Sequence, residues 1–147
     1  MSTLTTASRP VEDAVHHQIE RIIYLFFRYL DDQQYDELAA LFAPEGVWHR
    51  AGKALRGPNG VREAMAQRPA GFTTRHIITN IVIDATSSNH VHASYYMTVF
   101  MHEGAERATK QVPLELPLHV SVFDQTFIRS GSGWLIQGLS GLPTFHR

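Results

Sequence analysis

The first part of the chain places its apolar residues at a helical period. They recur every three or four positions, which is the spacing of one buried helix face: Val15, Ile19, Ile22, Phe26 and Leu30. A second, shorter helix is predicted from about Gln33 to Ala43, and a third from Val61 to Arg68 before Pro69. Between these two helices, residues 47–56 are typical of a short hairpin.

From Thr73 onward the pattern changes to that of strands. Four runs are rich in β-branched side chains or alternate between two faces: 73–85, 90–102, 118–129 and 133–140. A turn cluster at 86–89 joins the first two runs, and a longer polar connection precedes the last two. Helices followed by antiparallel strands predict an α+β fold rather than an alternating α/β fold.

Length and composition predict one domain. The chain has 147 residues, of which 44% are hydrophobic and 18% charged, enough to fill a single core. We expect a flexible leader at 1–10, a domain over 11–142 and a C-terminal tail at 143–147. With no cysteine in the chain, thiol catalysis and disulfides are excluded.

Charge and hydropathy argue against two classes of partner. The formal net charge of -1 does not favour binding of nucleic acid. The longest strongly apolar run, 22–27, is far shorter than the roughly 20 residues of a membrane span, so no membrane is expected as a partner. The first ten residues lack the apolar stretch of a secretory signal, which favours a cytoplasmic protein.

One stripe of the long helix carries a phenol and a carboxylate. Positions i, i+4, i+7 and i+11 lie on one side of a helix, and they hold Glu20, Tyr24, Phe27 and Asp31. Asp31 stands at the helix boundary, where a carboxylate can act in catalysis or cap the next helix. The run Asp31-Asp32-Gln33-Gln34 is typical of a capping box, so the residues alone favour the cap and leave both roles open.

The strands supply a histidine and an apolar surface. Alternation places His76 and Asn80 on one face of the first long strand. It places Tyr95, Met97 and Val99 together on one face of the next strand. An apolar surface with few polar groups is typical of a small-molecule site, so we expect a small hydrophobic ligand. A half-buried structural histidine is the alternative reading of His76.

Nine histidines in this short chain make metal chemistry a hypothesis worth weighing. His90 and His92 lie on one strand face and are the best-spaced pair, and His16-His17 and His102-Glu103 are further candidates. No acid or third histidine follows at a ligand spacing, so a solvated strand end is favoured and no metal is expected. A metal-dependent enzyme using this pair is the less favoured alternative.

Several segments resemble the SnoaL-like branch of the nuclear transport factor 2-like superfamily over residues 11–142. The resemblance is carried by Ile19–Phe42, by Thr74–Asn80 and by Ser132-Gly133-Trp134. Within the first segment, Asp31 is followed by an aromatic-Asp-x-Leu start to the second helix. This branch includes scytalone dehydratase, bile-acid dehydratase, polyketide cyclases and the small subunits of ring-hydroxylating dioxygenases. The resemblance implies a cone in which about three helices pack on a strongly curved antiparallel sheet around a deep pocket.

The resemblance also implies roles for individual residues. In the dehydratase members an Asp at the end of the first helix bonds a strand His, and these roles fall on Asp31 and His76. Such a carboxylate holds one imidazole nitrogen, stabilises the imidazolium and leaves the other nitrogen free as a base. The family tyrosine before the Asp is Phe26 here, which leaves Tyr24 as a substitute. The second pocket histidine of scytalone dehydratase falls on Met101.

Two further side chains complete the expected site. Tyr95 is the expected hydrogen-bond donor to a developing enolate oxygen, because alternation turns its phenol toward the pocket. Trp48 adds a flat wall and an indole donor, and the remaining expected substrate contacts are Asn80, Met97, Val99, Met101 and Phe26.

These expectations define a function and a rival. We expect a cofactor-independent dehydratase, isomerase or cyclase that acts on a carbonyl compound of polyketide, steroid or aromatic type. The rival is a non-catalytic binding or assembly module similar to a dioxygenase small subunit. Tyr96 and Phe100 on the opposite strand face predict burial against another copy, as a dimer or a trimer.

Overall fold

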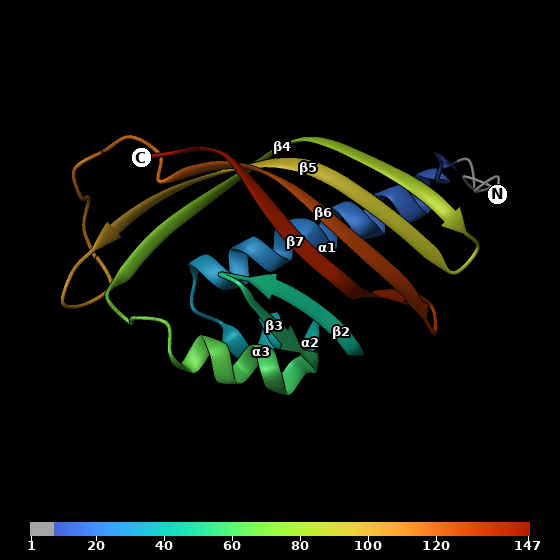
Figure 1. Ribbon diagram of the computed structural model, residues 1–147, viewed down its shortest axis with the longest axis horizontal. Helices are drawn as coiled ribbons and strands as arrows, with labels where there is room; N and C mark the ends of the chain where they lie inside the picture. The colour runs from blue at the N-terminus through green and yellow to red at the C-terminus, as the bar shows by residue number, and fades with distance from the viewer. Residues whose placement is uncertain (1–7) are drawn as a thin grey trace.

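A strongly curved sheet crosses over one long helix and bends around it (Figure 1). The computed structural model describes residues 8–147. Over this range the chain forms three helices: α1 (Asp13–Asp31), α2 (Tyr35–Ala40) and α3 (Gly57–Ala66). It also forms seven strands: β1 (Arg9–Pro10), β2 (Phe42–Arg50), β3 (Lys53–Arg56), β4 (Phe72–Ser87), β5 (His90–Glu103), β6 (His119–Ser130) and β7 (Gly133–His146).

All strands belong to one sheet with the order β1-β4-β5-β6-β7-β2-β3. Neighbouring strands are antiparallel, except that β2 and β7 run parallel. The long strands β4 to β7 bend over α1, while α2, α3 and the β2–β3 hairpin gather near its C-terminal end (Figure 1). The predicted α+β fold with a cone-like curved sheet is therefore confirmed. Among residues 8–147, no helix is both long enough and apolar enough to cross a bilayer.

The core lies between α1 and the concave face of the sheet. The helix buries Ile19 and Phe26 as its period predicts, whereas Val15 and Ile22 are half-buried at the border of the buried face. On β5 the predicted alternation is confirmed, since every second side chain is buried: Val91, Ala93, Tyr95, Met97 and Val99. Tyr96 points outward and is 48% exposed.

Two helix boundaries differ from the sequence prediction. The second helix ends at Ala40, and β2 begins at Phe42, so residues 42 and 43, which were expected to end the helix, lie inside a strand. The Ile136 N–H donates to the Leu41 carbonyl oxygen at 2.8 Å. This segment therefore pairs with β7 as a strand and does not continue the helix. The third helix begins earlier, at Gly57, because Pro58 suits the first turn of a helix.

The expected domain boundaries need correction at both ends. Residues 143–146, expected to be a tail, continue β7 and pair with β6 as far as His146 opposite His119. Such pairing joins segments that are distant in sequence, so the local pattern of residues does not predict it. Of the expected leader, residues 1–7 lie outside the described residues, whereas Arg9 and Pro10 pair with the far end of β4.

A tight turn after α1 determines where the last residue of the helix lies. Gln33 has a φ of 56°, and the Gln34 N–H donates to the Tyr29 carbonyl oxygen at 2.8 Å. Together with a second bond from the Gln33 N–H, this forms a Schellman motif. The Gln33 side-chain amide donates to the carbonyl oxygens of Ala70 and Phe72, each at 3.1 Å. The turn is thereby attached to the start of β4.

The loop before β4 tolerates no side chain at Gly71. A Cβ at this position would lie 1.8 Å from the Gly104 carbonyl oxygen, and the Gly104 N–H donates to the Gly71 carbonyl oxygen at 3.1 Å. We therefore expect Gly71→Ala to lower the free energy of unfolding by about 1–3 kcal/mol, measured by urea denaturation. As a control, Gly133→Ala adds a Cβ that meets nothing within 4 Å. Wild-type stability of Gly71→Ala would contradict the close approach.

Candidate active site

The concave side of the sheet contains a cavity of about 380 Å³ near the C-terminal end of α1. Most of its wall is apolar, from Phe27, Leu30, Trp48, Phe72, Met97, Val99, Met101, Leu118, Phe123 and Pro143. Seven polar residues complete the wall: His49, Arg50, Arg68, Thr74, His76, His119 and Ser121. An apolar cavity with a few convergent polar groups is the usual form of a small-molecule site.

The Asp31 carboxylate is buried at the edge of this cavity and accepts hydrogen bonds from β4. Its Oδ1 lies 2.5 Å from His76 Nδ1, and the Thr74 hydroxyl donates to the same oxygen at 2.7 Å. The backbone N–H of His76 donates to Oδ2 at 2.9 Å. The side chains of Asp31 and His76 are only 5% and 9% exposed, so this pair is well shielded from water.

These contacts decide between the two sequence interpretations of Asp31. The N-cap of α2 is Gln34, and no side chain caps that helix. Asp31 is instead the last residue of α1, and the Schellman motif turns the chain away after it. The capping interpretation is wrong, because the turn places the carboxylate against β4 rather than against the N–H groups of α2.

The surroundings of Asp31 hold its carboxyl group in the ionised form. Burial by itself raises the pKa of Asp31, but hydrogen bonds and the charge of His76, with the Thr74 hydroxyl, outweigh burial and lower the pKa below its usual value. The His76 ring lies 5.2 Å from the Phe27 ring, which packs beside it. Since Nδ1 faces Asp31, Nε2 is the ring nitrogen left for a ligand.

Arg68 interacts with Asp31 indirectly, through the side chain of Thr74. Arg68 Nη2 donates to Thr74 Oγ1 at 3.2 Å, and Nη1 donates to the Tyr35 hydroxyl at 2.9 Å. The Thr74 hydroxyl in turn donates a hydrogen bond to Asp31, so a chain of hydrogen bonds runs from Arg68 to His76. The end of α1 is thus held against the segment that runs from Arg68, just after α3, to the start of β4.

Two of the expected tyrosines lie outside the cavity. Tyr95 is fully buried behind the wall, where its hydroxyl donates to Gln125 Oε1 at 2.8 Å and its ring stacks on Phe123. Burial, together with the charge of Asp124, raises the pKa of Tyr95 well above its usual value. Tyr95 is therefore corrected from hydrogen-bond donor to core residue.

Tyr24 lies on the surface of α1 and is 44% exposed. It shares a helix stripe with Phe27 and Asp31 as predicted, but the sheet covers only the C-terminal part of that stripe. Burial and the neighbouring Glu20 raise the pKa of Tyr24. The expected role of Tyr24 as a catalytic donor is wrong, since it cannot reach the cavity.

Two residues that were expected to contact the substrate do not line the cavity. Asn80 has a φ of 56° and is exposed, because a β-bulge between Thr79 and Val82 interrupts the alternation of β4. Phe26 is fully buried one layer behind the wall, with its ring 5.1 Å from that of Trp48. The other expected wall residues, Trp48, Met97, Val99 and Met101, do line the cavity.

His119 is a histidine of the cavity that was not among the site residues expected from the sequence. His119 on β6 and His76 on β4 both pair with Val99 of β5, so the two histidines flank that strand in register. Adjacent strands are separated by about 4.8 Å, which places the two backbones about 10 Å apart on one face. His119 Nδ1 is buried and makes no hydrogen bond within residues 8–147. Alternation along 118–129 was the signal that could have identified His119 and Ser121.

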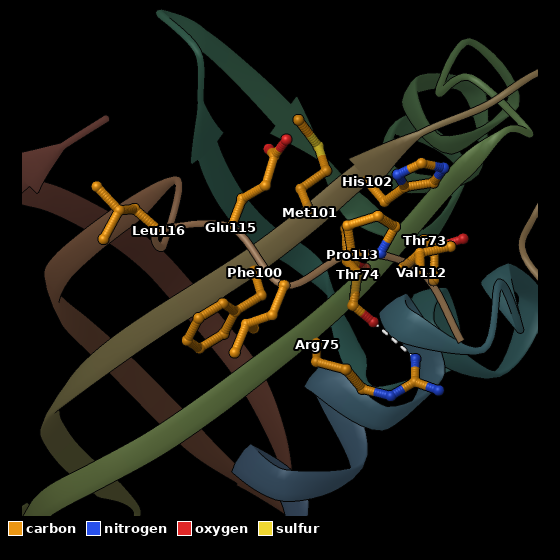
Figure 2. A pocket seen from close by; sticks show the side chains of 11 residues that line it. Thr73, Thr74, Arg75, Phe100, Met101, His102, Val112, Pro113, Glu115 and Leu116 are labelled. Carbon is orange, nitrogen blue, oxygen red and sulfur yellow. Dashed lines mark hydrogen bonds between the residues drawn. The ribbon is translucent and has the colours of Figure 1, made fainter.

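A second pocket of about 270 Å³ lies where residues 112–116 pass over β4 and β5 (Figure 2). Phe100 and His102 line it, as does Arg75, whose guanidinium donates to the Thr74 carbonyl oxygen at 2.7 Å. His102 therefore faces away from His76, as the alternation predicts. Met101 borders both pockets.

The histidine pair considered for a metal is used in other contacts. His90 Nδ1 lies 3.0 Å from the Ser87 hydroxyl, and His92 Nε2 lies 2.8 Å from Asp124 Oδ1. In the described part of the chain, one group of three ligand-bearing residues comes together elsewhere, on the surface of α1: His16, His17 and Glu20. Neither His90 nor His92 belongs to it.

Comparison with known proteins agrees with the class defined by this cone and its cavity. The family model of the SnoaL-like domain matches residues 13–140, which is most of the chain. The chain belongs to the SnoaL-like family, and the sequence resemblance is confirmed. No curated protein matches the sequence.

Solved structures share the fold at low sequence identity. A candidate scytalone dehydratase from Novosphingobium aromaticivorans is 20% identical with a TM-score of 0.73, over 88% of this chain and 84% of that one. A type 2 hexachlorocyclohexane dehydrochlorinase is 16% identical with a TM-score of 0.76, over 91% and 88%. A protein from Catenulispora acidiphila in complex with S-DNPA is 19% identical with a TM-score of 0.68, over 90% and 95%.

The lowered pKa of Asp31 predicts a pH-dependent contribution to stability. The folded state binds the proton on Asp31 less tightly than the unfolded state does, so this contribution is complete above the unfolded pKa and is lost as the pH falls through the folded pKa. We expect Asp31→Asn to lower the free energy of unfolding by about 1–3 kcal/mol near neutral pH. The difference from wild type should narrow below about pH 4.

Urea denaturation over a pH series measures this difference. Asp36→Asn is the control, because its side chain is 87% exposed and should change stability little at any pH. A stability difference between wild type and Asp31→Asn that stays constant down to about pH 2 would contradict a lowered pKa.

Proposed function

We propose that this protein is a cofactor-independent dehydratase, isomerase or cyclase that transfers protons on a hydrophobic carbonyl compound. His76 is the general acid and base, and Asp31 orients it. The observation that carries the proposal is the buried Asp31–His76 contact at 2.5 Å, beside an apolar cavity that His76 lines. Structural relatives include a dehydrochlorinase and a candidate scytalone dehydratase, and both names describe eliminations.

In this mechanism His76 Nε2 takes the proton from the carbon next to the carbonyl group. The electron pair of that C–H bond moves into an enolate, and the Asp31 carboxylate stabilises the imidazolium that forms. For a β-hydroxy substrate, the enolate expels the hydroxyl group, which leaves as water with the proton from His76. For an isomerase, the same proton returns to a different carbon.

The enolate oxygen requires a donor, and the cavity offers replacements for Tyr95. His119 and Ser121 line the wall across from His76, on the strand beyond β5. His119 Nδ1 has no hydrogen-bond partner among residues 8–147, which supports a role in which this ring orients toward a bound ligand. Two histidines on strands that flank one apolar residue can contact opposite ends of a small ring compound.

Solvent exchange tests the proton-transfer step without knowledge of the natural substrate. In D₂O, wild-type protein should accelerate deuterium incorporation next to the carbonyl of bicyclic ketones such as 2-tetralone, monitored by NMR. His76→Asn keeps an amide donor for Asp31 but has no base, so it should lower the exchange rate by roughly 100-fold or more with little change in melting temperature.

An exposed pair of the same kind supplies the matched control. His92 and Asp124 also form a His–Asp contact, at 2.8 Å, but their side chains are 37% and 59% exposed and they lie outside the cavity. His92→Asn should leave exchange unchanged. If wild type and His76→Asn exchange a ketone panel at equal rates, the enzymatic proposal fails and a binding module is favoured.

The outer face of the sheet supports association between copies of the chain. Three large hydrophobic side chains on β4 and β5 are substantially exposed: Ile77 at 48%, Val82 at 59% and Tyr96 at 48%. Phe100, expected on the same interface, is partly covered by residues 112–116 of its own chain instead (Figure 2). We expect light scattering to give a dimer or trimer, and Tyr96→Lys to shift it toward monomer. A wild-type monomer at high concentration would contradict this.

A further inference from the structure

The proposed mechanism leaves one charged group of the cavity unused. Arg50 ends β2 beside the β2–β3 turn, and its side chain lines the cavity and is half-buried. Its guanidinium carbon lies 5.6 Å from the centroid of the Trp48 ring. Within residues 8–147, Arg50 makes no side-chain hydrogen bond and has no carboxylate within 4.0 Å.

The other guanidinium of the cavity, that of Arg68, already makes hydrogen bonds within the protein. Arg68 binds Thr74, the Tyr35 hydroxyl and the Leu30 carbonyl oxygen, and so acts on the structure of the site. Burial lowers the pKa of Arg50, and the positive charge of Arg68 lowers it further. The positive charges of Arg50 and Arg68 therefore add together within the same cavity.

No acid of the described chain compensates this charge at the cavity surface. Neither Asp nor Glu is among the residues 8–147 that line the cavity. The Asp31 carboxylate at the edge of the cavity already binds Thr74 and His76. A partly desolvated guanidinium without an acidic partner is energetically unfavourable, and a bound anion relieves that cost.

We propose that the ligand of this cavity is a ring compound with a carboxylate group, held by Arg50 while its ring packs along Trp48. The inference rests on the proposed use of the cavity as a substrate site and specifies the substrate class. A guanidinium matches a carboxylate with two parallel hydrogen bonds. A carboxylate is favoured over a phosphate because Arg50 is the one arginine of the cavity that makes no side-chain hydrogen bond within residues 8–147, whereas a doubly charged group generally takes several cations.

The remaining wall agrees with a compact aromatic or alicyclic acid. The cavity volume of about 380 Å³ lies at the small end of the range for ligand sites, roughly 300–1,000 Å³. Val99 supplies an apolar floor between His76 and His119, and Met97 extends that floor beside Ser121. Binding the carboxylate at Arg50 would fix the orientation of the ring relative to His76.

Paired probes that differ in charge alone test this assignment. Binding of 2-naphthoate and of 2-naphthamide is measured by isothermal titration calorimetry at low ionic strength. Wild-type protein should bind the acid at least about tenfold more tightly than the amide. Arg50→Met should reduce this preference to less than about twofold while changing the affinity for the amide little, and Arg50→Lys should retain part of it.

A neighbouring cation provides the control for charge. Lys53 pairs directly with Arg50 across the hairpin but is exposed and does not line the cavity. Lys53→Met should therefore keep the wild-type preference for the acid. The proposal is overturned if wild type shows no preference, if Arg50→Met keeps it, if Lys53→Met loses it equally, or if neither probe binds at about 1 mM.

Catalysis and ligand class are separated by a further variant. His76→Asn should retain the preference for 2-naphthoate, because Arg50 is intact. If deuterium exchange fails in wild type but the Arg50-dependent preference remains, the enzymatic function is rejected and the ligand assignment stands. If exchange depends on His76 but Arg50→Met leaves the preference unchanged, the ligand assignment is rejected and the enzymatic function stands.

Discussion

The buried carboxylate of Asp31 is the constraint on which the site depends. A carboxylate shielded from water is stable only if hydrogen bonds replace its hydration, and Thr74 and His76 supply three. All three come from β4, more than 40 residues away in sequence. The end of α1 and the start of β4 must therefore meet in one relative position, which the Gln33 side chain reinforces from the turn.

The same curvature that covers α1 also creates the cavity. Strands β4, β5 and β6 bring His76, Val99 and His119 side by side on the concave face. The apolar wall excludes water and so strengthens electrostatic interactions within it. In the proposed function the Asp31–His76 pair transfers protons within this cavity, and Arg50 supplies the positive charge that holds the ligand. The proposed chemistry and ligand class thus depend on different residues of one cavity.

The errors in the predicted site share a physical cause. Alternation correctly turned Tyr95 inward, but inward-facing side chains occupy two layers, and Gln125 binds its hydroxyl in the deeper one. The helix stripe through Tyr24 was also correct, yet the sheet does not cover that end of it. At Asn80 a bulge interrupts the period itself. Periodicity predicts the face of a helix or strand on which a side chain lies. How deeply that side chain is buried depends on the elements that pack against that face.

The sequence by itself determined the helices, the long strands and the α+β class, and it indicated Asp31 and His76 as candidate site residues, because periodic burial and the family motif are properties of local segments. It left open whether Asp31 caps α2 or binds β4, and only the tertiary structure decided this through the turn at Gln33. The tertiary structure also decided that His119 and Arg50 share the cavity. Such groupings depend on strand order and sheet curvature, which are set by long-range packing rather than by neighbouring residues.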